Sequence, residues 1–89
     1  MIRKELTIVN KLGLHARAAA KLVGCASKFE SEIYIERNNK RVNGKSIMGV
    51  LMLAASQGTA IVLEVSGQDE ALASEAIESL IGERFGEAE

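Results

Sequence analysis

The sequence predicts an α+β fold in two layers, in which helices pack on one face of an antiparallel sheet. Segments that alternate apolar and polar residues are interspersed with segments that carry apolar residues at helical spacing, in the order βαββαβα. The connections between the segments are short, and each helical segment has one apolar stripe. Short connections favour antiparallel pairing, and a single stripe favours helices that cover one face of a sheet.

The first half of the chain is expected to form a strand, a helix and a hairpin. Residues 2–9 alternate loosely between apolar and polar side chains and predict a strand. Residues 16–27 carry Ala, Leu and Val at i, i+3, i+4 and i+7, which predicts a helix with one buried stripe. Residues 32–37 and 40–42 predict two strands, because the intervening Asn38-Asn39 pair is typical of a turn.

A short helix and a strand are expected next. Residues 47–55 are nearly all apolar and follow Ser46, a preferred N-cap residue, so they predict a helix. Gln57-Gly58 ends this segment. Residues 60–66 are rich in β-branched side chains and predict a strand, which Gly67 ends.

The last helix is expected over residues 69–84. Asp69 and Glu70 would lie in its first turn, where a negative charge is favourable against the helix dipole. The chain from Gly86 onward is expected to fray. The buried stripe of this helix is expected to comprise Leu72, Ala73, Ala76, Ile77, Leu80 and Ile81.

Composition narrows the class of protein. A chain of 89 residues with no linker-like or low-complexity tract predicts one domain over residues 1–89. A net charge of −1, with two Phe, one Tyr and no Trp, argues against a nucleic-acid-binding protein. No apolar run approaches the roughly 20 residues that a membrane span needs. A single Cys fits a reducing cytoplasm, and with a single His it argues against a zinc site, so we expect neither metal nor cofactor.

The sequence around the only histidine suggests an anion site. His15 occupies the N-cap position of the first predicted helix, where Ser, Thr, Asp or Asn would normally bind the free amides. The amides of Ala16, Arg17 and Ala18 would then remain available to an anion. The Arg17 guanidinium suits phosphate oxygens, and Gly13 allows a tight turn before the site. His15 would be a histidine that accepts a phosphoryl group; alternatively, it simply ends a loop and Arg17 is an ordinary solvated residue.

The uncharged segment 47–53 has two interpretations. Its helix can turn only one stripe, with Val50, Leu53 and Ala54, toward the core. The remaining apolar residues would form an exposed docking surface, unless the helix is buried on all sides. Those remaining residues are Ile47, Met48, Leu51 and Met52.

Ser46 also has two interpretations. As an N-cap it contributes about 1 kcal/mol to helix stability. As a phosphorylation site it would place about two negative charges beside the apolar residues and oppose docking. The sequence pattern alone favours the cap.

Two motif blocks resemble those of a known family. Gly13-Leu14-His15-Ala16-Arg17, together with residues 43–50 (Asn-Gly-Lys-Ser-Ile-Met-Gly-Val), resembles the HPr family, the histidine-containing phosphocarriers of the bacterial phosphotransferase system. The resemblance covers nearly the whole chain, and Gln57-Gly58-Thr59 also matches. It implies an open-faced β-sandwich, in which three helices cover one side of a four-stranded antiparallel sheet.

The resemblance also implies roles for particular residues. His15 would accept a phosphoryl group on Nδ1 from phosphorylated Enzyme I and pass it to a IIA domain, with Arg17 contacting the phosphate. Ser46 matches the serine that HPr kinase/phosphorylase modifies. Ile47, Met48 and Leu51 match the apolar docking patch. A cytoplasmic, monomeric carrier without turnover of its own is expected.

Two points depart from a simple match. Many members of the family have Pro after the arginine, where this chain has Ala18. The loss of that Pro costs about 0.4–1 kcal/mol of pre-organisation. Residues 10–13 resemble the nitrogen-regulatory paralogue, whereas residues 45–49 resemble kinase-regulated HPr, which we favour. The other alternative is a regulatory binding module that acts through the apolar patch.

Overall fold

A computed structural model describes residues 1–89 as four strands, three α-helices and a short 3₁₀ turn. The order βαββαβα and the α+β class are confirmed. The elements are β1 (Ile2–Thr7), α1 (Ala16–Ala26), β2 (Glu32–Arg37), β3 (Lys40–Asn43), α2 (Ile47–Met52), β4 (Ala60–Ser66), α3 (Glu70–Gly82) and η1 (Arg84–Gly86).

The four strands form one antiparallel sheet in the order β1-β4-β2-β3. Ile33 pairs with Val65 and Ile35 with Leu63, and all four side chains are buried on the same face. The alternation that predicted these strands therefore points one set of side chains into the core. The opposite face carries Glu64 with Arg3 and Arg41, and the Arg41 guanidinium lies over the Tyr34 ring.

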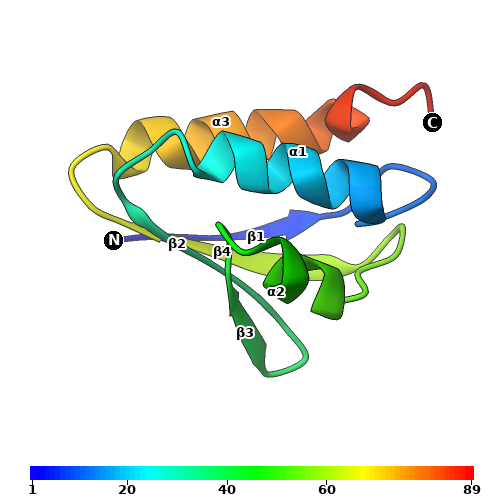
Figure 1. Ribbon diagram of the computed structural model, residues 1–89, viewed down its shortest axis with the longest axis horizontal. Helices are drawn as coiled ribbons and strands as arrows, with labels where there is room; N and C mark the ends of the chain where they lie inside the picture. Colours follow the sequence, from blue (N-terminus) through cyan, green and yellow to red (C-terminus); the bar gives the residue numbers. More distant parts are fainter.

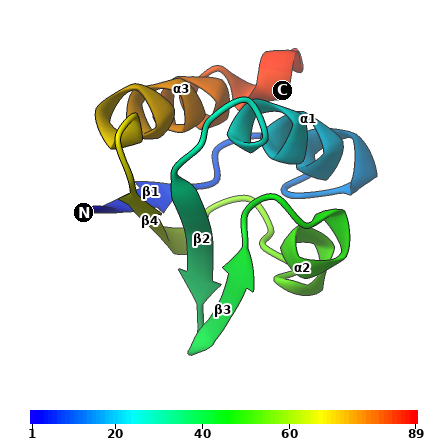
Figure 2. The same cartoon turned by 60° about the vertical axis from the view of Figure 1, so that its left-hand side comes forward.

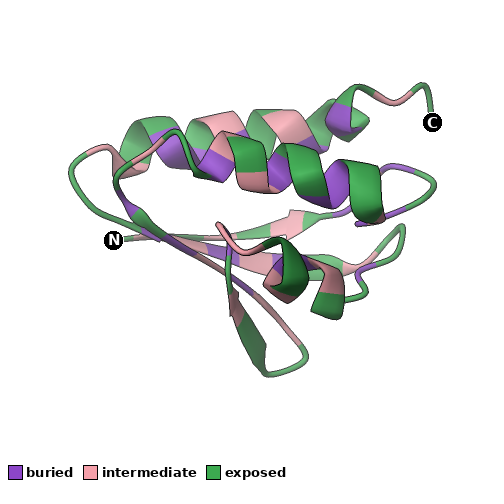
Figure 3. Cartoon of the chain, viewed as in Figure 1, coloured by how far each residue is buried: buried purple, intermediate pink, exposed green.

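The three helices cover the buried face of the sheet. Helices α1 and α3 lie side by side over the sheet, and α2 packs against α1 and β3 (Figures 1 and 2). The buried stripes of α1 and α3 face inward, while their outer surfaces are exposed (Figure 3). The core includes Leu22 from α1, Leu63 from β4 and Ile77 from α3. None of the helices combines the length and the apolar content that crossing a membrane requires.

Helix α2 is shorter than the predicted 47–55. It ends at Met52, with Leu53 as its C-cap, and Ala54 has a φ of 51°. A positive φ is incompatible with a continuing right-handed helix, so the apolar run does not extend the helix. Val50 and Leu53 are buried as expected, but Ala54 is exposed.

The buried stripe of α3 is rotated relative to the predicted one. Ala73, Ile77 and Ile81 are buried as expected, and Ala76 and Leu80 are partly buried. Leu72 is 65% exposed, and Ser74 is buried in its stead. Ser74 can be buried because its hydroxyl donates a hydrogen bond to the carbonyl of Ala71 at 3.1 Å.

Asp69 joins the start of α3 to the loop between α1 and β2. Its carboxylate accepts hydrogen bonds from the amides of Glu30 (2.9 Å) and Ser31 (3.0 Å) and from the Ser31 hydroxyl (2.5 Å). These bonds, led by the one from the Ser31 hydroxyl, lower the pKa of Asp69 below its ordinary 3.8. Asp69 is the N-cap residue of α3 but makes no side-chain cap bond, so its main contacts are tertiary.

The Asp69 contacts predict an acid-sensitive share of the folding stability. Because the pKa is lowered on folding, the contribution is complete above the unfolded pKa and is lost as pH falls through the folded pKa. We expect Asp69→Asn to lower the urea midpoint at neutral pH and the deficit to shrink below pH 3.8. The control is Glu75→Gln, an exposed position on α3. Equal midpoints for both variants at neutral pH would contradict this prediction.

Candidate functional site

His15 is the N-cap residue of α1, as the sequence predicts. Its backbone is extended, with φ −76° and ψ 179°, and its carbonyl accepts the amide of Ala19 at 2.8 Å. Its side chain makes no cap hydrogen bond, so the imidazole is available for other contacts. The side chain is 28% exposed.

The loop before His15 is fixed by the segment that follows α2. The amide of Leu14 donates to the carbonyl of Ala55 at 2.8 Å, and Leu14 is buried. Gly13 has a φ of 66°, and a Cβ there would lie 2.5 Å from the Ala55 carbonyl oxygen. Only glycine fits that backbone and that gap, so Gly13 determines where His15 projects.

The start of α1 leaves backbone donors without partners in the helix. The first residues of a helix cannot bond to carbonyls of a preceding turn, and this applies to Ala16, Arg17 and Ala18. Ala16 and Arg17 are exposed, whereas Ala18 is fully buried. Of the three predicted amides, therefore, two belong to residues that solvent can reach. The dipole of α1 adds partial positive charge at this end.

An open hollow of about 740 Å³ lies in front of His15. The hollow brings His15 and Arg17 together, as predicted, and adds three residues from the end of the chain. Its lining is Lys11, Leu12, His15, Ala16, Arg17, Glu87, Ala88 and Glu89.

The prediction that the chain frays from Gly86 is wrong, because Glu87 accepts a hydrogen bond from Asn10 and the Glu89 carbonyl accepts one from the Lys11 amide at 2.6 Å. The segment before them is anchored as well. The side chain of Phe85 is fully buried in the core, and Lys21 Nζ donates to the Phe85 carbonyl at 2.6 Å. A buried aromatic ring outweighs the entropy that would favour fraying. The sequence did contain a signal for this anchor. The chain has only two phenylalanines, and one of them is Phe85.

Glu87 is the side chain that reaches His15. Glu87 Oε2 contacts His15 Nε2, and Glu87 Oε1 accepts a hydrogen bond from Asn10 Nδ2 at 3.0 Å. The hydrogen bonds from Asn10 and then from His15 lower the pKa of Glu87. Asn10 is fully buried and also donates to the carbonyl of Gly13 at 2.8 Å. Sequence reasoning missed both Asn10 and Glu87.

The residues around α2 form a second surface. Ser46 Oγ accepts the amide of Gly49 at 3.2 Å, so Ser46 caps α2 as predicted. Ile47 and Met48 are exposed, and Met48 is 66% exposed. Leu51 is half-buried and packs against the core. The interpretation of α2 as buried on all sides is wrong, because Val50 is its only buried residue.

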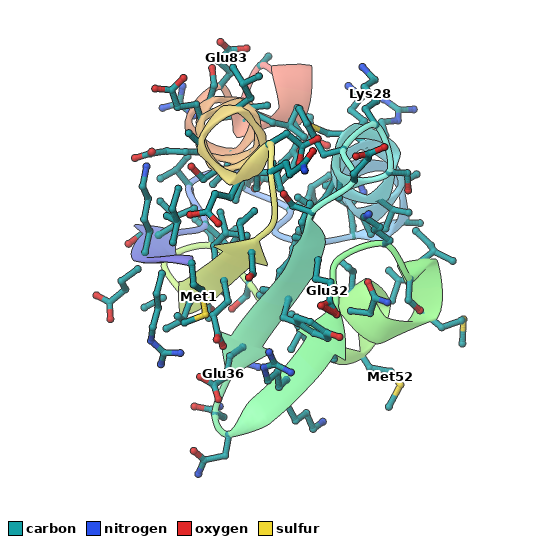
Figure 4. All side chains as sticks on the ribbon, turned by 90° about the vertical axis from the view of Figure 1, so that its left-hand side faces the viewer. Met1, Lys28, Glu32, Glu36, Met52 and Glu83 are labelled. Carbon is teal, nitrogen blue, oxygen red and sulfur yellow. The ribbon has the colours of Figure 1, made fainter.

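Met52 extends this surface. Its side chain is exposed and projects away from the protein beyond the end of α2 (Figure 4). Four neighbouring positions on one short helix therefore offer apolar atoms to solvent to different degrees. Such a patch is typical of a docking surface, since thioether side chains adapt to the shape of a partner. Because α2 packs against α1, the patch and His15 lie on adjoining elements.

Comparison with known proteins shows the family to which this chain belongs. The family model described as "PTS HPr component phosphorylation site" matches residues 2–83. The phosphocarrier protein HPr of Neisseria meningitidis serogroup A is 54% identical over 89 residues, which is 100% of both chains. HPr-C-His from Thermoanaerobacter tengcongensis is 48% identical, with a TM-score of 0.96 over 100% of both chains. An HPr dimer from the same organism is 49% identical, with a TM-score of 0.79 over 98% of this chain and 100% of that one.

Proposed function

Since the chain belongs to the HPr family of phosphocarriers of the phosphotransferase system, we propose that His15 is the residue that carries the phosphoryl group. The observation that supports this most directly is the position of His15 at an uncapped helix start beside Arg17. Backbone amides, a helix dipole and a guanidinium together form a site for phosphate oxygens.

The transfer needs a nucleophile and little else from the protein. The lone pair of His15 Nδ1 attacks the phosphorus atom of the donor's phosphoryl group. A P–Nδ1 bond forms while the bond to the donor breaks, and that electron pair returns to the donor. The amides of Ala16 and Arg17 and the Arg17 guanidinium bind the phosphoryl oxygens, so positioning and charge neutralisation provide the catalysis. The second transfer is the reverse reaction with an acceptor.

The partners follow from the family. The chain works with components of the phosphotransferase system, and we propose Enzyme I as donor and a IIA domain as acceptor. Ile47, Met48 and Leu51 would form the docking patch, and the exposure of Met52 extends it. The relatives bear the name phosphocarrier protein HPr, which supports HPr itself over the nitrogen-regulatory paralogue. We also propose that the protein is a monomer, that residues 1–89 form one domain and that it works in the cytoplasm.

The decisive experiment is ³¹P NMR of the protein after incubation with phosphoenolpyruvate and Enzyme I. We expect one acid-labile phosphoryl group per chain, with the chemical shift of Nδ1-phosphohistidine. Lowering the pH should release it as inorganic phosphate. An acid-stable label, or one on Nε2, would contradict the assignment.

Ser46 is proposed as the regulatory phosphorylation site, addressed by an HPr kinase/phosphorylase. Ser46→Asp is expected to weaken Enzyme I binding roughly tenfold, or about 1.4 kcal/mol, because it places a charge beside Ile47 and Met48. Asp and Asn are both good N-caps, so α2 should keep its stability. Ser46→Asn therefore isolates the effect of the charge, and isothermal titration calorimetry gives the Kd. Equal weakening by both variants would mean that the hydroxyl, rather than the charge, matters.

A further inference from the structure

We propose that Glu87 is a positioning residue for phosphoryl transfer, because its carboxylate holds the His15 ring with the proton on Nε2 and the lone pair on Nδ1. This proposal rests on the proposed function of His15. The family model ends at residue 83, so Glu87 lies outside the matched region. The proposal stands on the contact between Glu87 Oε2 and His15 Nε2 and on the contacts that orient the carboxylate.

A series of hydrogen bonds runs from Asn10 through Glu87 to His15, and it fixes which atom donates at each step. Asn10 Nδ2 donates to the Gly13 carbonyl at 2.8 Å and to Glu87 Oε1 at 3.0 Å. The Asn10 amide cannot be reversed, because its oxygen would then face two acceptors. The ionised Glu87 carboxylate can only accept hydrogen bonds, so His15 Nε2 must be the donor in their contact. A neutral imidazole with a proton on Nε2 has its lone pair on Nδ1.

The carboxylate is held in place from both sides. Phe85, two residues before it, is fully buried, and its carbonyl accepts the Lys21 ammonium. Glu89 lies two residues after it. The Glu89 carbonyl accepts a hydrogen bond from the Lys11 amide at 2.6 Å, and its carboxylate forms an ion pair with the Lys11 ammonium at 3.3 Å. The Glu87 side chain is only 15% exposed. A side chain anchored in this way orients its partner at little cost in entropy.

The negative charge of Glu87 also suits the phosphorylated ring. When Nδ1 forms its bond to phosphorus and Nε2 keeps its proton, the ring acquires a positive charge. Glu87 contacts Nε2, whereas the phosphoryl group binds Nδ1. The carboxylate therefore stabilises the charge of the ring and repels the phosphoryl oxygens less than a carboxylate beside Nδ1 would. No proton has to leave the ring during the transfer.

The test compares the tautomers of His15 in ¹⁵N-labelled, unphosphorylated protein at a pH where the ring is neutral. The critical variant is Glu87→Gln, which keeps the size and shape of the side chain. Asn10 would bind the new amide oxygen, so the amide nitrogen would face His15 Nε2 and donate to it. We therefore expect the ring proton to move to Nδ1, which the ¹⁵N shifts and ring couplings report directly. Glu87→Ala should give a mixture of both tautomers.

The second measurement is the rate of phosphorylation by Enzyme I. In Glu87→Gln the ring proton would occupy Nδ1, the nitrogen that attacks phosphorus. Phosphorylation should therefore slow by roughly tenfold or more, and Glu87→Ala should lose less. The control is Glu83→Gln, which removes one negative charge at the C-cap of α3. Glu83 is labelled in Figure 4. It should match the wild type in tautomer and rate.

The two measurements separate this proposal from the proposed function. A wild-type protein that Enzyme I fails to phosphorylate would contradict the function of His15, while the tautomer result would still report on Glu87. The positioning role is overturned if Glu87→Gln keeps the proton on Nε2. It is also overturned if the proton moves and the rate stays at the wild-type value.

Discussion

The His15→Ala variant is expected to lose all phosphoryl acceptance and to remain folded. The chain has no other histidine that could take the group. The imidazole makes no cap hydrogen bond, and the Glu87 carboxylate that it contacts would keep its hydrogen bond from Asn10. Its loss should therefore change the free energy of unfolding by only about 1 kcal/mol. An active-site change that leaves stability nearly intact separates chemistry from folding.

Mass spectrometry after incubation with phosphoenolpyruvate and Enzyme I measures the incorporated group, and urea unfolding measures stability. Arg17→Lys is the companion variant, because it keeps the positive charge and loses the planar fork that grips two oxygens. It should still be phosphorylated, but more slowly. Incorporation into His15→Ala at one group per chain would mean that another residue carries the phosphoryl group.

Phe85→Ala is expected to give the largest loss of stability. The ring is fully buried, and truncating a buried Phe typically costs 3–5 kcal/mol. In a domain of this size, about 1 kcal/mol corresponds to 4–8 °C in Tm, so Tm should fall by more than about 10 °C. The segment 84–89 would also lose its anchor, and the His15 tautomer should become mixed, as in Glu87→Ala.

Phe29→Ala is the matched control for this substitution. Phe29 is only half-buried and packs at the edge of the core, so the same truncation should cost less. Differential scanning calorimetry gives both Tm values. If Phe85→Ala lowered Tm no more than Phe29→Ala, the buried anchor would have no energetic role.

Local patterns were enough to predict the fold class and the position of His15. In β2 the buried Ile33 and Ile35 alternate with residues that are exposed or only partly buried, and this alternation is a property of neighbouring residues. The missing N-cap side chain at His15 is visible in the same way. Element ends were less predictable: α2 stops at Met52 because Ala54 takes a left-handed backbone, and nothing in the apolar run indicates this.

The parts that could not be predicted depend on residues far apart in the chain. Asn10 and Glu87 are separated by 77 positions, and His15 and Glu87 by 72. No periodicity relates such residues, and Asn10 alone looks like an ordinary loop residue. Asp69 is similar, because its acceptor role depends on a loop 38 positions earlier. Leu72 was predicted to be buried and is exposed, because α3 is rotated so that Ser74 faces the core. The rotation of a helix about its axis depends on its packing against the rest of the fold.

The order of the strands sets a sequence of events for a chain that is being synthesised. β1 is made first, but its only partner in the sheet is β4, the last strand of the four. Residues that pair across most of the chain close a large loop, which slows folding and leaves β1 unpaired on the nascent chain. Glu87 emerges later still. The contact between Glu87 and His15 therefore cannot form until residue 87 has left the ribosome, so a partly synthesised chain that carries His15 still lacks it.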